Sequence, residues 1–141
     1  MAQAEFHEVM DVDRDKLYAA ITKYEDYPEF VEGMKSVKVE RSAQNCARVS
    51  YQVSMMKEIS YTLEHKENPA AGRIEWSLIS SDSFKKNSGV WELKPAGRGK
   101  TDVRYSLELE FTFPVPGIIL NRLVRGSLPS MVKGFVKRAG R

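Results

Sequence analysis

The sequence predicts an α+β fold in which a curved seven-stranded antiparallel sheet is wrapped on a long C-terminal helix, with two short helices after the first strand. Seven segments alternate apolar and polar residues with a period of two. Turn-forming residues separate the last six of these segments at hairpin spacing. The only long stretch with helical periodicity is the last one, Pro114 to Arg141. With 141 residues the chain has the size of one domain, and we expect residues 1–141 to form it.

The first strand and the two short helices are expected at the N-terminus. Ala4–Val12 has the strand alternation, and Asp13 is a good N-cap for a helix from Arg14 to about Lys23. Pro28 ends the helical pattern, because the residue before a proline avoids the helical region. A short second turn is expected over Glu29–Glu32.

The remaining six strands follow one another through short turns. Their alternation predicts one buried and one solvated face, which is typical of an antiparallel sheet. The expected ranges are Lys35–Ser42, Ala47–Met55, Glu58–Lys66, Arg73–Ser80, Phe84–Lys94 and Thr101–Phe113. A sheet of this size needs a cover for its apolar face, and only the C-terminal stretch is long enough to provide one.

The C-terminal stretch is amphipathic at about 100° per residue. Its apolar side holds Leu120, Leu123, Val124, Leu128, Met131 and Phe135. The opposite side holds Arg122, Arg125, Lys133 and Lys137. Pro129 removes a backbone hydrogen bond inside the pattern, so we predict two halves, Ile118–Leu128 and Ser130–Arg138. The inner face is expected to line a pocket, and the outer face to meet a membrane, a partner or only solvent.

The predicted pocket lies between the sheet and this helix, because one helix over a curved sheet leaves a concave apolar space. The side chains expected to line it are Phe30, Tyr51, Val53, Tyr61, Leu63, Trp76, Leu78, Trp91, Tyr105, Leu107, Leu109, Phe111, Leu120, Leu123, Val124, Leu128, Met131 and Phe135. Hydroxyls of Tyr51, Tyr61 and Tyr105 could orient a ligand there, although core packing explains these rings equally well. Glu8 and His65 fall in the apolar phase of their strands and are candidate polar cavity residues, unless they lie at strand ends that reach water.

Charge is distributed unevenly along the chain. The formal net charge is +3, and no acidic residue follows Glu110. A basic amphipathic C-terminus is attracted to anionic lipid or to nucleic acid, although such residues can also simply solvate a helix. We expect no specific DNA binding.

Metal and thiol chemistry find little support in the sequence. His7, His65 and Cys46 are too far apart in the sequence to predict a metal site, and no cofactor is expected. A single cysteine cannot form an internal disulfide and fits a reducing compartment. The N-terminus lacks the basic start and apolar core of a signal peptide. We therefore expect a cytoplasmic protein that is either free or peripheral at a membrane.

Two motifs and the element order carry a resemblance to a known family. The motifs are Y-x-x-Y-P-E-F at Tyr24 to Phe30 and G-V-W-E-L at Gly89 to Leu93. From Glu5 to about Arg138 the chain resembles the START-like (SRPBCC, helix-grip) superfamily. Within it, the chain is similar to the polyketide cyclase/dehydrase group that includes coenzyme Q-binding proteins and the ribosome-association toxin. The resemblance implies a hydrophobic cavity between sheet and C-terminal helix that holds lipids, quinones, sterols or polyketides.

Three functional hypotheses remain open from the sequence. The first is binding or carriage of a hydrophobic small molecule such as a lipid, quinone or polyketide-like compound. The second is a cyclase, dehydratase or hydrolase enzyme, which would need an acid–base pair in the cavity. No catalytic motif of the family matches residue by residue, so no catalytic residue is assigned. The third is binding to a ribosome or another partner through the basic C-terminal helix.

Overall fold

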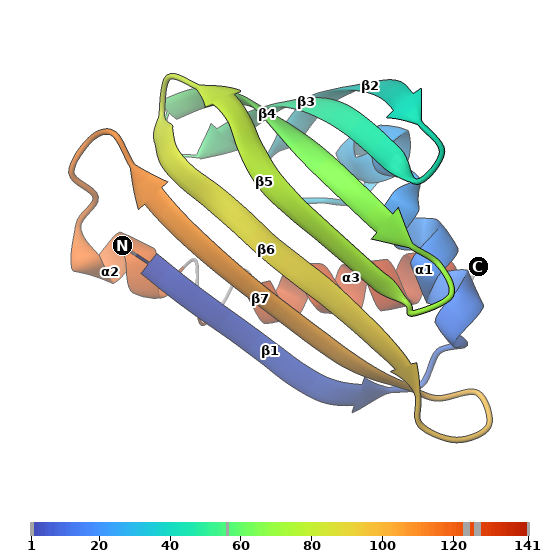
Figure 1. Cartoon of the computed structure of the whole chain (residues 1–141). Helices are drawn as coiled ribbons and strands as arrows, with labels where there is room; N and C mark the ends of the chain where they lie inside the picture. The colour runs from blue at the N-terminus through green and yellow to red at the C-terminus, as the bar shows by residue number, and fades with distance from the viewer. Residues whose placement is uncertain (1, 56, 123–124, 126–127, 141) are drawn as a thin grey trace.

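The described residues form seven strands, three α-helices and one short 3-10 helix (Figure 1). The computed structural model describes residues 2–55, 57–122, 125 and 128–140. The strands are β1 (Ala2–Met10), β2 (Met34–Ala43), β3 (Cys46–Met55), β4 (Lys57–Asn68), β5 (Arg73–Ser81), β6 (Phe84–Pro95) and β7 (Thr101–Phe111). The helices are α1 (Arg14–Thr22), the short 3-10 helix η1 (Tyr24–Glu29), α2 (Gly117–Arg122) and α3 (Leu128–Ala139). The predicted fold class is confirmed.

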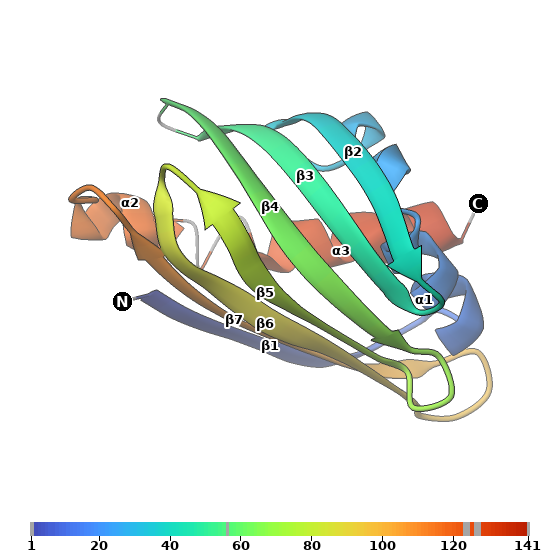
Figure 2. The same cartoon turned by 45° about the horizontal axis from the view of Figure 1, so that its top comes forward.

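The strands form one antiparallel sheet in the order β1-β7-β6-β5-β4-β3-β2. Consecutive strands from β2 to β7 are neighbours, whereas β1 pairs with β7 at the edge. The sheet curves around the helices, and α3 lies across its concave face, which we call the inner face (Figures 1 and 2). In both views α1 lies at one end of the sheet, and α2 lies at the other, near the β3–β4 and β5–β6 turns. We call these the α1 end and the α2 end.

Helix α1 begins as the sequence predicts. The Asp13 carboxylate accepts a hydrogen bond from the Lys16 backbone N–H at 3.2 Å, which satisfies one of the unpaired donors of the first turn. The following turn differs from the prediction, because η1 spans Tyr24–Glu29 and contains Pro28. The proline therefore lies inside a tight helical turn and does not precede one. Gly33 then has a φ of +81°, which glycine adopts without a steric penalty.

The described residues of the C-terminal stretch form two helices, and Pro129 does not separate them. Helix α2 ends at Arg122 and α3 begins at Leu128, so Pro129 stands in the first turn of α3. Proline is tolerated there because its missing N–H would have no partner within the helix. Pro129 therefore helps to begin the second helix.

The β5–β6 hairpin pairs over only part of its length. The register joins Arg73–Trp76 to Gly89–Glu92. At Gly89, a Cβ atom would lie 2.4 Å from the Trp76 ring and 2.3 Å from the Ser106 carbonyl oxygen. Only glycine fits there, because the indole packs directly against the backbone of β6.

No helix in the described part of the chain is long and apolar enough to cross a membrane.

Candidate ligand-binding site

The inner face is filled by aromatic rings where α3 crosses it. The Phe135 ring lies with its centroid 5.1 Å from Tyr27, 5.0 Å from Phe30 and 5.5 Å from Trp91. Phe135 is only 2% exposed. This part of the inner face is a packed core, because the rings contact one another edge to face.

The buried side of α3 differs from the predicted stripe. It consists of Leu128, Val132, Phe135 and Ala139, while Met131 is partly buried. The sequence analysis missed Val132, because it treated one helical phase as continuous from residue 118 to 138. Within α3, the spacing of Leu128, Val132 and Phe135 places these three side chains on one face of the helix. This spacing is visible in the sequence and could have predicted the burial of Val132.

A second apolar cluster lies at the α2 end. It is built on Val53, Ile59 and Phe84. Around these three pack apolar side chains that are only partly buried, namely Met34, Tyr61, Leu78, Leu109, Phe111 and Phe113. The inner face therefore keeps accessible apolar surface at this end, in contrast to the region under α3.

Two tyrosines carry hydroxyls on the inner face, Tyr61 beside this cluster and Tyr105 in the larger core. Among the described residues, the hydrogen bonds of tyrosine hydroxyls are those of Tyr24, Tyr27 and Tyr51, and none involves Tyr61 or Tyr105. Burial raises the pKa of both phenols above the ordinary value, and the neighbouring Tyr61 raises that of Tyr105 further. Both hydroxyls therefore remain protonated at neutral pH and can donate a hydrogen bond to a ligand oxygen.

A buried amide adds a third polar group, and the sequence analysis missed it. Asn87 is 5% exposed and its side-chain oxygen accepts a hydrogen bond from the Trp76 indole N–H at 3.1 Å. Asn87 shares the apolar phase of β6 with Gly89 and Trp91, which was the available signal. The Trp76 ring centroid also lies 5.4 Å from that of Tyr105, so the Asn87 amide and the Tyr105 ring contact the same indole.

The predicted polar residue His65 is buried, at 6% exposure. Its Nε2 lies 2.8 Å from the Tyr51 hydroxyl, and its ring stacks at 4.5 Å on Tyr24. Burial lowers the pKa of His65 to about 3, so the imidazole is neutral at physiological pH. Its Nδ1 has no partner among the described residues. A neutral imidazole held between two tyrosines fits a role in packing better than a role as a general base.

The other candidate polar residue, Glu8, is exposed, so the prediction of a cavity carboxylate is wrong. Glu8 pairs with Val103 on β7, and its own strand is the edge of the sheet. A side chain on an edge strand can turn toward water even when it stands in the apolar phase. Glu67, which follows His65 in phase on β4, is the carboxylate that reaches the interior, and it accepts a hydrogen bond from the Tyr24 hydroxyl at 2.6 Å.

The other predicted lining residues divide by burial. Fully buried are Tyr51, Val53, Leu63, Trp76, Trp91, Tyr105, Leu128 and Phe135. Partly buried are Phe30, Tyr61, Leu78, Leu107, Leu109, Phe111, Leu120 and Met131. Leu123 and Val124 lie outside the described residues. The four predicted basic residues Arg122, Arg125, Lys133 and Lys137 are all exposed.

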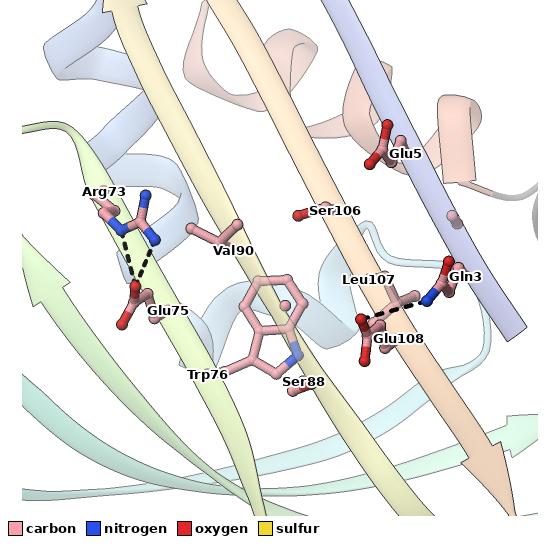
Figure 3. A pocket seen from close by; sticks show the side chains of 12 residues that line it. Gln3, Glu5, Arg73, Glu75, Trp76, Ser88, Val90, Ser106, Leu107 and Glu108 are labelled. Atoms are coloured by element: carbon pink, nitrogen blue, oxygen red, sulfur yellow. Dashed lines mark hydrogen bonds and ion pairs between the residues drawn. The ribbon is translucent and has the colours of Figure 1, made fainter. Parts of the chain in front are cut away.

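A hollow of about 630 Å³ lies on the outer face of the sheet, opposite the predicted cavity (Figure 3). Polar side chains line it and pair with one another. Arg73 donates to the Glu75 carboxylate at 2.6 Å, and Gln3 donates to Glu108 at 3.5 Å. Small residues, Ser88 and Ser106, form its floor. An open hollow lined by several charged side chains does not have the features of a site for an apolar ligand.

Together, the curved sheet, the crossing helix and the apolar inner face define a START-like protein with the helix-grip fold. The chain belongs to the family described as polyketide cyclase / dehydrase and lipid transport, which matches residues 10–136.

Similar proteins of known structure or name cover almost the whole chain. The Zhui aromatase/cyclase from Streptomyces sp. R1128 has a TM-score of 0.85 at 13% identity, covering 99% of this chain and 93% of that one. A START superfamily protein from Mycobacterium smegmatis has a TM-score of 0.83 at 18% identity, covering 99% and 98%. The ribosome association toxin RatA of Escherichia coli K12 is 22% identical over 125 residues, which are 89% of this chain and 78% of RatA.

Proposed function

We propose that the chain binds a neutral, largely apolar small molecule on the inner face of the sheet, from its middle to the α2 end. The hydroxyls of Tyr61 and Tyr105 carry this proposal. They are protonated donors set among apolar side chains, and the hydrogen bonds found for tyrosine hydroxyls of the described residues are those of Tyr24, Tyr27 and Tyr51. Membership of a family described by polyketide cyclisation and lipid transport supports the same reading.

The charge of the ligand follows from the residues that surround it. Apart from tyrosines, the buried polar residues in the described part of the chain are His65, Ser83, Asn87 and Thr101, and none of them is charged at neutral pH. The Glu67 carboxylate, which reaches the interior, is already paired with Arg41 at 3.2 Å. A buried carboxylate or phosphate would need a cation to offset its desolvation. The proposed ligand is therefore an uncharged molecule with carbonyl or hydroxyl oxygens, such as a quinone or a polyketide-like aromatic compound, and not a fatty acid.

Binding without catalysis is the preferred form of this proposal. A cyclase or dehydratase would need an acid and a base that both face the ligand. His65 is neutral and already bonded to Tyr51, and Glu8 is exposed. Neither sequence candidate therefore supports the enzymatic alternative.

The basic residues of the C-terminal stretch favour an anionic partner in addition. Arg122, Arg125, Lys133 and Lys137 are exposed, whereas Arg138 pairs with Glu29 at 2.9 Å. The name of RatA adds the ribosome to the anionic partners to be considered.

A fluorescence titration tests ligand binding directly. Trp76 and Trp91 are the two tryptophans of the chain, and both are buried on the inner face. We expect a short-chain ubiquinone to quench their emission with saturation, and palmitate to have no such effect. Tyr61→Phe should weaken quinone binding about fivefold, the value of one hydrogen bond.

Tyr18→Phe is the matched control, because Tyr18 lies on α1 at the far end of the sheet. It should leave quinone affinity unchanged. Saturable binding of palmitate that exceeds that of the quinone, or no effect of Tyr61→Phe beyond that of Tyr18→Phe, would contradict the proposal.

A further inference from the structure

Helix α2 presents apolar side chains to solvent. None of its six residues is buried, and Ile118 is 76% exposed, more than Val9 at 53% or Ile79 at 43%. Ile119 and Leu120 next to it are only partly buried. A single exposed isoleucine needs no explanation, but a short helix whose apolar residues all remain accessible indicates that another surface covers it.

Positive charge surrounds this apolar helix. Arg122 is the last residue of α2 and Arg125 follows it, and both are exposed. On the opposite side, the Lys57 ammonium lies 4.3 Å from the centroid of the Phe113 ring, which precedes α2 in the chain.

Negative charge at the α2 end is limited. Glu58 is paired with Lys35 and Glu108 with Lys86, while Asp82 stands in the β5–β6 turn and Glu110 lies near the end of β7. No acidic residue follows Glu110 in the sequence. The α2 end therefore combines exposed aliphatic surface with an excess of cations.

This combination fits a lipid bilayer better than it fits RNA. Anionic headgroups attract lysine and arginine, and aliphatic side chains gain free energy by entering the acyl boundary beneath the headgroups. RNA phosphates attract the same cations, but an exposed isoleucine would gain little from them.

We propose that the α2 end docks on an anionic membrane surface, with Ile118 and Ile119 inserted and with Lys57, Arg122 and Arg125 on the headgroups. The accessible apolar cluster of the inner face lies at this same end. A water-insoluble ligand could then pass between the bilayer and the inner face without crossing water. Only this last step rests on the proposed ligand-binding function, whereas docking itself does not.

Co-sedimentation of the full chain with vesicles tests the docking surface. We expect binding to vesicles of phosphatidylcholine mixed with phosphatidylglycerol, little binding to phosphatidylcholine alone, and weaker binding as salt is raised. Ile118→Ser should weaken binding to the mixed vesicles about fivefold, and Arg122→Glu about tenfold.

Matched controls come from the α1 end. Val9→Ser removes an exposed aliphatic side chain, and Arg98→Glu reverses an exposed charge in the β6–β7 turn. Both should bind the mixed vesicles like the unmodified chain. Equal losses in the controls, or no sedimentation with the mixed vesicles, would overturn the proposal. Salt-sensitive binding to ribosomal RNA that Ile118→Ser leaves unchanged, without vesicle binding, would overturn it in favour of a nucleic-acid partner.

The quinone titration without vesicles separates the two proposals. Ile118→Ser and Arg122→Glu should bind the quinone normally, which also shows that they are folded. If vesicle binding persists while no neutral ligand binds, the ligand-binding proposal fails and the docking surface stands. If the quinone binds and the vesicles do not, the docking proposal fails and the ligand-binding proposal stands.

Discussion

The two ends of the sheet use their apolar inner faces differently. Toward the α1 end, α3 covers the sheet, and its Phe135 ring packs against Trp91 of β6. The buried Tyr51 hydroxyl there forms a hydrogen bond with His65. Toward the α2 end, apolar residues such as Leu109 and Phe111 remain partly accessible, and none of the hydrogen bonds found among the described residues involves the Tyr61 hydroxyl. The contrast indicates that one half of the molecule maintains the fold while the other remains available for binding.

The largest expected effect tests whether the α3 region maintains the fold. Phe135→Ala removes a ring that is 2% exposed and contacts three other aromatic rings, so it should lower the free energy of unfolding by roughly 3–5 kcal/mol. Phe111→Ala at the α2 end removes a partly buried ring and should cost roughly 1–2 kcal/mol. Urea unfolding of both variants measures the difference, and equal losses would show that the two ends do not differ in this way.

A pH-dependent effect of intermediate size is expected from His65. Its pKa is lowered from 6.5 to about 3 in the folded chain, so between these values the unfolded chain binds a proton that the folded chain does not. The contribution of the neutral His65 to the free energy of unfolding is therefore fully present above pH 6.5. Between pH 6.5 and about 3 the free energy of unfolding falls as the pH decreases, by about 1.4 kcal/mol per pH unit.

Urea unfolding at neutral and mildly acidic pH measures this slope. His65→Gln should unfold with a shallower pH dependence than the unmodified chain. Tyr51→Phe should keep the steep dependence, because the imidazole remains buried. Identical slopes for all three proteins would mean that His65 does not carry the effect.

The smallest expected effects compare two tyrosine hydroxyls. Tyr51→Phe leaves the buried Nε2 of His65 without its partner and should destabilise the fold by about 1 kcal/mol. Tyr61→Phe breaks none of the hydrogen bonds found among the described residues and should change stability by less than about 0.5 kcal/mol. Thermal unfolding distinguishes these outcomes. A larger loss in Tyr61→Phe than in Tyr51→Phe would assign the Tyr61 hydroxyl to the fold.

Much of the candidate site could be predicted from the sequence, because strand alternation fixes which side chains share a face. Tyr61, Trp76 and Tyr105 were placed on the inner face by this pattern alone, and they lie there. Asn87 obeys the same alternation. It was missed because only apolar residues were assigned to the inner face of this strand. Glu8 also obeys it, but its strand lies at the sheet edge, and strand order is not visible in a two-residue period.

By itself, the sequence determined the element order, the antiparallel sheet and its apolar face. These depend on local patterns such as the Asp13 cap, the hairpin turns and the two-residue alternation, which act over a few residues. Three features were decided only by the tertiary structure. They are the start of α3 at Leu128, the burial of Val132 in the core, and the hydrogen bond between His65 and Tyr51. These features depend on contacts between residues far apart in the chain, whose packing overrides a local helical phase.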